Sequence, residues 1–355
     1  MDDGIPLDPF HQAVLTPEQT SLYLERIQLA QSTAAERPSL ALLSKLLLAQ
    51  LEHIPKDTSP LHVAEPEWRA GPSAIKLGTA FTNMPEGVSA FDRIVRERKG
   101  AFCFAINATF SAFLRAFGFR VSELVGRTFK SLGNDPLTHP DGWKWGTMTH
   151  EIMLADWEGS DGRYLVDGAW GPWAAPVPIK LCDGETVMGL NDYEAFRLVQ
   201  EHLPLAPSQT PPIDRPAAKG WTFSRRITPR GERVSLPVVV GSGSSTGGYW
   251  SPLFHFDVVS VPLLDFRLYH HFSASHPLAS FTAFWLVTKL IPDSGGARRS
   301  MMYAEKDGHA GTRAKVYTTG GHAAEGSLEG RDVEWVEMET DTMQAYLRKE
   351  FGFGF

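Results

Sequence analysis

The apolar side chains of this 355-residue chain change their spacing near residue 118, and this change limits the folds open to the chain. Before that point they recur at helical spacing, as at Ile106, Phe110, Phe113, Leu114 and Phe117. Gly118 follows as a plausible helix C-cap. After it come short strand-like runs at 120–125, 151–157 and 163–167. We therefore predict an α+β protein whose N-terminal part is helical.

Local signals place several further elements. Thr16 with Pro17 and Gln19 predicts a helix start, and Ser39 predicts a second helix that Pro55 ends. In the C-terminal third we expect a helix over 278–291, strands over 314–319 and 333–339, and a closing helix over 341–351. Residues 203–219 read as an extended connector and residues 241–248 as a surface loop.

Three residue types in the order Cys103, His150, Asp167 indicate nucleophilic catalysis. A thiol attacks carbonyl carbon as the thiolate, so a catalytic cysteine needs a histidine to take its proton and a carboxylate to orient that histidine. Cys103 lies near the start of a predicted helix, whose positive dipole end favours a thiolate. A turn at 159–162 makes the strands bearing His150 and Asp167 adjacent and antiparallel, so the two side chains can meet.

Charge and composition exclude several classes of protein. The chain has 34 basic and 41 acidic residues and a formal net charge of −7, without the basic surplus that nucleic-acid binding requires. Its N-terminus resembles no secretory signal, and no run of about 18 apolar residues predicts a membrane span. With only two cysteines, Cys103 and Cys182, no disulfide framework is expected. These features predict a soluble cytoplasmic protein.

Beyond this chemistry, the chain resembles the arylamine N-acetyltransferases from about residue 16 to its end. Five segments carry the resemblance: Lys99 to Asn107, Thr149-His150, Val166 to Gly171, Ser275-His276-Pro277 and Gly330-Arg331. Tyr249-Trp250-Ser251-Pro252 is similar to the fungal branch of the family.

The resemblance implies a three-part fold with a cysteine-protease-like catalytic core. Its parts are a helical bundle (residues 1–118) with the cysteine, a β-barrel with a connector (119–250) that carries the histidine and aspartate, and an interdomain helix with an α/β lid (251–355). It also implies ping-pong chemistry without a permanently bound cofactor. Cys103 would take an acyl group from acetyl-CoA, or from propionyl- or malonyl-CoA, and pass it to an arylamine or hydrazine. His150 would hold the thiolate as an ion pair, and Asp167 would orient the imidazole.

By the same resemblance, Gly146, Thr147 and Ser275 match the positions that contact coenzyme A. Phe102 and Trp170 are candidates for the wall of the acceptor site, with plain core packing as the other interpretation. Trp170 would narrow that site and favour small or flat amines. We expect no metal site, because His150-Glu151 lacks the second histidine of a zinc-protease helix, and His270, His271 and His276 lack matching acidic or thiol partners.

The chain also departs from the family pattern at Lys99, Ala101 and Ala105. Lys99 replaces an arginine, which should weaken the ion pair that braces the cysteine loop. The neighbouring cluster of Arg93, Arg96, Arg98 and Lys99 is interpreted as a solvated face, with attraction of the coenzyme A phosphates as the other interpretation. Two alternatives stay open: a papain-like or transglutaminase-like enzyme that uses an amide as acyl donor, and a non-catalytic family member that only binds coenzyme A or an aromatic ligand.

Overall fold

The computed structural model describes residues 10, 12–62, 90–206, 218–228, 233–234, 248–303, 313–320, 333–337 and 340–354. The Gly330-Arg331 pair, residues 241–247 of the predicted surface loop and residues 207–217 of the predicted connector lie outside these ranges.

Three α-helices and a short 3-10 helix form most of the N-terminal part. Helix α1 (Pro17–Arg26) begins at Thr16, whose hydroxyl accepts a hydrogen bond from the Gln19 backbone while the Gln19 side chain accepts one from the Thr16 backbone. After η1 (Gln31–Ala35), Ser39 caps α2 (Leu40–His53) in the same manner. Helix α3 (Cys103–Ala116) ends before Gly118, which has a φ of +90°. These three predicted helices are confirmed.

The chain between α2 and α3 contains short elements. Strand β1 (Lys56–Asp57) follows α2 and is succeeded by η2 (Ser59–Leu61), and the single turn η6 (Asp92–Arg96) precedes the cysteine loop. β1 pairs with a strand of the C-terminal sheet and also forms a parallel bridge from Lys56 to Ala101. It therefore connects the cysteine loop to the C-terminal part of the protein.

Eight strands form the larger sheet, in the order β5-β4-β3-β2-β9-β8-β7-β6, with antiparallel pairing throughout. The sheet is nearly closed into a barrel. Its strands are β2 (Arg120–Phe129), β3 (Trp145–Asp156), β4 (Tyr164–Val166), β5 (Ile179–Lys180), β6 (Thr186–Met188), β7 (Ala195–Glu201), β8 (Gly220–Ile227) and β9 (Tyr249–Phe256). The predicted strands near 120, 151 and 163 are confirmed.

The C-terminal part contains a second sheet, in the order β1-β10-β11-β12-β13. Its other elements are α4 (Leu263–Ser275), η7 (Ser280–Thr282), β10 (Trp285–Leu290), β11 (Arg298–Tyr303), β12 (Arg313–Thr319), β13 (Glu334–Glu337), α5 (Thr340–Tyr346) and η8 (Leu347–Phe351). The helix predicted over 278–291 is wrong, because this stretch forms η7 and β10. Strand β10 lies between β1 and β11 and is buried along nearly its whole length, so it shows no polar alternation.

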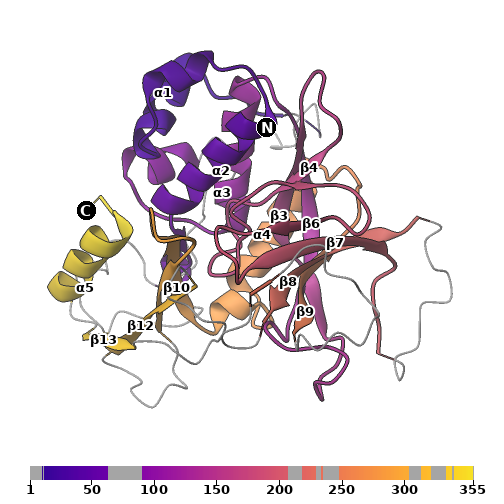
Figure 1. The fold of residues 1–355 in the computed structure, drawn as a ribbon. Coiled ribbons are helices and arrows are strands. Elements are labelled where there is room, and N and C mark those ends of the chain that lie inside the picture. Colours follow the sequence, from indigo (N-terminus) through magenta and orange to yellow (C-terminus); the bar gives the residue numbers. More distant parts are fainter. Residues whose placement is uncertain are drawn as a thin grey trace, which may run out of the picture.

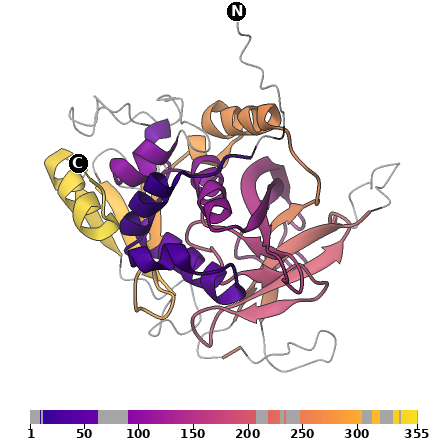
Figure 2. The same cartoon turned by 90° about the horizontal axis from the view of Figure 1, so that it is seen from above.

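Figure 1 shows the N-terminal helices above, the eight-stranded sheet at the right, and the five-stranded sheet with α5 at the left. In the view from above, the helices lie between α5 and the eight-stranded sheet (Figure 2). One apolar core joins these helices to the larger sheet, and a second lies between the smaller sheet and its C-terminal helices.

The residue boundaries of the three parts stay predictions. In the structure, strand β9 of the barrel runs across residue 250 to Phe256, and β1 pairs with the C-terminal sheet. No helix among the described residues has the length and apolar character needed to cross a membrane.

Candidate active site

Cys103 is the first residue of α3 and is fully buried. Because the first amides of a helix have no partner within it, the sulfur lies at the positive end of the helix dipole. The Cys103 thiol donates a hydrogen bond to the Thr149 carbonyl on β3 at 3.7 Å. The nucleophile predicted from the sequence therefore lies where α3 packs on the barrel.

His150 and Asp167 come together from neighbouring strands. His150 lies on β3, and Asp167 directly follows β4, which pairs antiparallel with β3. The Nε2 atom of His150 lies 2.7 Å from the Oδ2 atom of Asp167, and the two residues are 1% and 5% exposed. With Nε2 occupied by the carboxylate, Nδ1 is the nitrogen left for the sulfur of Cys103. The hairpin expected from the sequence thus produces the predicted contact.

The three groups shift one another's pKa in the direction of an ion pair. Burial alone raises the pKa of Cys103, but the hydrogen bond and charge of His150 and the charge of Lys56 outweigh it, so the pKa is lowered. Burial alone lowers the pKa of His150, but Asp167 and Cys103 raise it to about 9. Burial alone raises the pKa of Asp167, but His150 and Asn107 lower it. A thiolate facing an imidazolium follows from these shifts.

Asn107 braces the aspartate and received no role in the sequence analysis. Its Nδ2 donates to Asp167 Oδ1 at 3.1 Å and to the Glu151 carbonyl at 2.6 Å, while its Oδ1 accepts from the Gly168 amide at 3.0 Å. The Ala169 amide also donates to Asp167 Oδ1, at 2.9 Å. Asn107 lies four residues after Cys103, on the same face of α3. That spacing was a signal available in the sequence.

Both predicted wall residues lie beside the triad. The Trp170 ring meets the His150 ring edge to face, with centroids 4.4 Å apart. The Phe102 ring stacks on His270 at 5.1 Å and lies 6.0 Å from the Phe281 ring. Phe102 is fully buried and Trp170 is 7% exposed, so both also pack in the core.

Lys56 is a second residue that the sequence analysis did not single out. It is 7% exposed, and its Nζ donates to the Trp170 carbonyl at 3.2 Å. Burial lowers its pKa, and Cys103 and Asp167 oppose that effect. The buried amine of Lys56 therefore lies within electrostatic reach of the nucleophile.

Arg93, rather than residue 99, braces the loop before Cys103. Its Nε donates to the Gly100 carbonyl at 2.8 Å, and its guanidinium lies 3.4 Å from the carboxylate of Asp57, which is fully buried. Lys99 pairs instead with the half-exposed Glu97 at 2.9 Å. The expectation of a solvated face is wrong for Arg93 and Lys99, because the side chain of each is only 14% exposed.

Positions 100 and 101 of the same loop differ in whether they accept a Cβ atom. A Cβ at Gly100 would lie 2.5 Å from both the Asp57 Cβ and the Pro55 carbonyl oxygen, so this position requires glycine. The φ angle of Ala101 is not positive, so its Cβ causes no backbone strain. Ala101 forms the bridge to Lys56 of β1. The alanine at position 101 is therefore compatible with the loop.

The residues predicted to contact coenzyme A lie on two different elements. Gly146 and Thr147 are near the start of β3, and Ser275 ends α4, where its hydroxyl donates to the helix carbonyl of His271 at 2.7 Å. No described hydrogen bond joins the three residues. Lys130 lies against Gly146 and donates to the Ser280 hydroxyl at 2.8 Å, so it connects the two regions.

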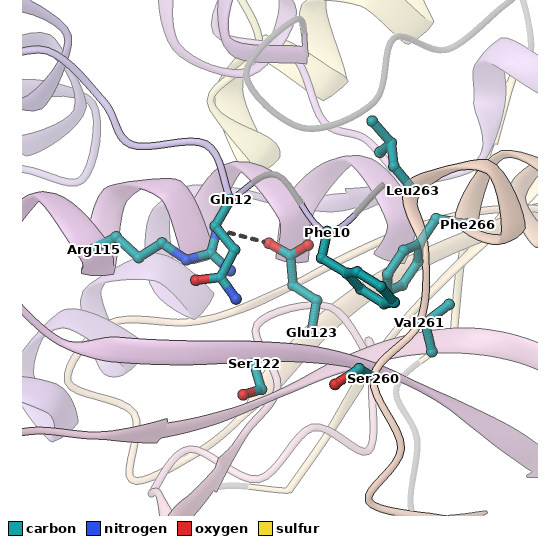
Figure 3. Close-up of a pocket in the computed structure, with 9 residues that line it drawn as sticks. All are labelled: Phe10, Gln12, Arg115, Ser122, Glu123, Ser260, Val261, Leu263 and Phe266. Atoms are coloured by element: carbon teal, nitrogen blue, oxygen red, sulfur yellow. Dashed lines mark hydrogen bonds and ion pairs between the residues drawn. The ribbon is translucent and has the colours of Figure 1, made fainter. Parts of the chain in front are cut away.

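A pocket of about 170 Å³ opens at the other end of α3 (Figure 3). There Arg115 pairs with Glu123 at 3.0 Å, and the guanidinium also donates to the carbonyls of Ala13 and Val121. Arg115 lies twelve residues after Cys103, a distance of roughly 18 Å along a helix. The pocket is therefore separate from the triad. Among the described residues, no three His, Cys, Asp or Glu side chains gather as a metal site requires.

Comparison with known proteins agrees with this geometry. A family model described as N-acetyltransferase matches residues 86–325. The arylamine N-acetyltransferase of Mycolicibacterium smegmatis is 24% identical over 274 residues, which are 77% of this chain and 76% of that protein. The N-malonyltransferase FDB2 of Fusarium pseudograminearum is 24% identical over 58% of this chain and 55% of its own length.

The fold is likewise similar to a solved structure. The arylamine N-acetyltransferase of Mycobacterium marinum in complex with CoA superposes with a TM-score of 0.59 at 20% identity, over 94% of this chain and 92% of that one. The likeness in fold therefore extends over nearly the whole of both chains. The chain belongs to the arylamine N-acetyltransferase family.

Proposed function

We propose that this protein is an acyltransferase that moves an acetyl group from acetyl-CoA to aromatic amines through a thioester on Cys103. The observation that carries the proposal is the buried contact between His150 and Asp167 beside that sulfur. Membership of the family and the likeness to relatives named as arylamine N-acetyltransferases support it. No permanently bound cofactor is needed, because the CoA thioester is a cosubstrate.

In the first half-reaction the Cys103 thiolate attacks the carbonyl carbon of the thioester. A bond forms between that carbon and Sγ, and the bond to the coenzyme A sulfur breaks. The departing coenzyme A thiolate takes a proton from the His150 imidazolium, so the products are free coenzyme A, neutral His150 and acylated Cys103. Asp167 keeps the imidazole oriented by accepting from Nε2.

In the second half-reaction the amine nitrogen attacks the carbonyl carbon of the acylated cysteine. His150 accepts the proton of the amine, and the bond from carbon to Sγ breaks. The thiolate and imidazolium are restored, and the N-acyl product leaves. The low pKa of Cys103 assists this step because a more acidic thiol is a better leaving group.

Phe102 and Trp170 are the proposed acceptor wall. The Trp170 ring stands edge-on to His150, where an aromatic amine would have to deliver its proton. With the Trp170 ring in this position, the narrowed acceptor site would favour small or flat amines. Gly146, Thr147 and Ser275 are the proposed coenzyme A contacts, and Lys130 adds a positive charge between their two elements.

We place the protein in the cytoplasm, because the nucleophile must stay reduced and both cysteines are free thiols. The function is tested by supplying acetyl-CoA with an aniline, and separately a peptide amide without a thioester. We expect N-acetylaniline and no turnover of the amide. Turnover of the amide alone would instead assign the protein to the papain-like or transglutaminase-like enzymes.

The non-catalytic alternative is tested by alkylation. The low pKa of Cys103 predicts that iodoacetamide labels it faster than Cys182 at neutral pH, once the reagent enters the buried site. Labelling of Cys103 no faster than Cys182, together with no acetylated cysteine, would support a binding protein without turnover.

A further inference from the structure

The position of Lys56 places a cation at the active site. Lys56 lies on β1, and its backbone bridges to Ala101, two residues before the nucleophile. The next residue, Asp57, donates its amide to the Ala101 carbonyl at 2.7 Å. β1 therefore lies alongside the segment that enters α3, and the charge of Lys56 acts on both Cys103 and Asp167.

Aromatic rings and one carbonyl surround the ammonium group. Nζ lies 4.8 Å from the ring centroid of Phe281 and 5.8 Å from that of Trp170. It donates one hydrogen bond, to the Trp170 carbonyl at 3.2 Å. Among the described residues, no carboxylate lies within 4.0 Å of Nζ. An ammonium has three donors, and the described hydrogen bonds of Lys56 use one of them.

A buried cation of this kind is costly unless an anion compensates it. The surrounding loop nevertheless makes room for the lysine side chain, because residue 171 is a glycine. A Cβ at Gly171 would lie 2.9 Å from the Lys56 Cδ. The cation is also next to Trp170 and Phe281, which lie beside His150 and Phe102 respectively. Cys103 and Asp167 supply negative charge near Lys56, but acylation removes the charge of the Cys103 thiolate. An anion carried by the acyl group or by the acceptor can then take its place.

We propose that Lys56 is a specificity-determining residue that binds a carboxylate of the substrate, carried either by the acyl group or by the aromatic amine. The inference rests on the proposed acyl transfer through Cys103. A short dicarboxylic acyl group, such as malonyl, would carry its free carboxylate a few bonds from the sulfur. An aminobenzoate would carry it on the acceptor ring. One relative, FDB2, is named as an N-malonyltransferase.

Two comparisons with the unaltered protein separate the sources of the carboxylate. The donor arm measures kcat/KM for malonyl-CoA and acetyl-CoA with one uncharged aniline. The acceptor arm measures kcat/KM for 4-aminobenzoate and 4-aminobenzamide with acetyl-CoA. We expect the carboxylated substrate to be favoured by about 10- to 100-fold in one arm, the size of a hydrogen bond to a charged group. No preference in either arm overturns the proposal.

The variant Lys56→Met tests whether the lysine is the cause. Loss of its charge also raises the pKa of Cys103, but that effect acts on both substrates and cancels in the ratio of their kcat/KM values. We expect the preference to disappear. The matched control is Lys289→Met, a half-buried lysine on β10 whose charge partners are Arg26, Glu350 and Glu52. An unchanged preference in folded Lys56→Met contradicts the proposal.

The outcomes also distinguish this inference from the proposed function. If neither thioester acylates Cys103, the acyl-transfer proposal itself fails. If acetyl-CoA and malonyl-CoA both acylate it and the two arms show no preference, only the carboxylate inference fails. Should Lys56→Met not fold, the two comparisons with the unaltered protein still decide the question.

Discussion

The imidazole of His150 and the carboxylate of Asp167 lie 2.7 Å apart in a buried site, although 17 positions separate the residues in the chain. The antiparallel pairing of β3 with β4 produces this contact, and Asn107 of α3 holds the carboxylate from the opposite side. Helix and barrel therefore share one catalytic array, with the Cys103 sulfur at the junction.

The variant Asp167→Asn tests the orienting role of the carboxylate. Without the negative charge, the pKa of His150 falls from about 9 and the imidazolium no longer stabilises the thiolate. We expect kcat to fall on the order of 10⁴-fold, as in other triads that lose this group. The measurement is steady-state acetyl transfer to an aniline.

The pH dependence of alkylation gives a second readout for the same variant. In the unaltered protein the thiolate and imidazolium persist between the lowered pKa of Cys103 and about pH 9, so iodoacetamide labelling should be nearly constant across that interval. In Asp167→Asn the rise in labelling should move to higher pH. Identical profiles for the two proteins would show that Asp167 does not control the ion pair.

The variant Asn107→Ala tests a positioning residue. Its amide donates to Asp167 and to the Glu151 carbonyl, so its loss frees the carboxylate to move. We expect kcat/KM to fall by about 10- to 100-fold, the cost of a misplaced catalytic group. The labelling profile of Cys103 should move toward higher pH.

Asn191→Ala is the matched control for Asn107→Ala. Asn191 also donates a side-chain hydrogen bond to a backbone carbonyl, that of Gly295 at 2.8 Å, but it contacts none of the triad. Loss of the Asn191 amide should leave the pH profile of Cys103 labelling unchanged. A purely structural role of Asn107 would lower stability in both variants and shift neither profile.

The brace of the cysteine loop is tested by comparing Arg93→Ala with Lys99→Ala. Removal of Arg93 leaves the Asp57 carboxylate buried without its guanidinium, which should lower the free energy of unfolding by about 3 kcal/mol. Lys99 pairs with an exposed glutamate, so its removal should cost less than about 1 kcal/mol. Urea unfolding of both variants measures the difference, and equal losses would refute the assignment.

The same comparison has an expected pH dependence. Burial raises the folded-state pKa of Asp57 above its unfolded value, and the charge of Arg93 opposes the increase. A raised folded-state pKa gives stability that is full below the unfolded pKa and is lost as the pH rises. Removing Arg93 enlarges that loss, so the deficit of Arg93→Ala should be smaller near about pH 4 than at neutral pH.

Local signals were enough to predict the elements that carry the triad. Thr16, Ser39 and Gly118 cap helices by interactions within a few residues, and the turn before β4 fixes the pairing that joins His150 to Asp167. The order of residues along the chain therefore predicted this contact without knowledge of the rest of the fold.

Elements that depend on distant partners could not be predicted in the same way. The apolar run of β10 reflects burial between β1 and β11, so it resembles a buried helix when read alone. The residue pattern alone did not place helix α4, although its buried residues Phe266, His270, Ser273 and Ala274 follow helical spacing. An interdomain helix within residues 251–355 was expected only from the family resemblance. Arg93 was interpreted as a surface charge and Lys56 was not singled out, because their burial arises only when β1 meets the cysteine loop.

The central claim is that the sulfur of Cys103 becomes acylated, and intact-protein mass spectrometry with peptide mapping tests it most directly. The protein is mixed with acetyl-CoA in the absence of an amine. We predict one acetyl group, located on Cys103, which disappears when an aniline is added, and no adduct in Cys103→Ser. Acetylation at Cys182, or undiminished acetyl transfer by Cys103→Ser, would contradict the account.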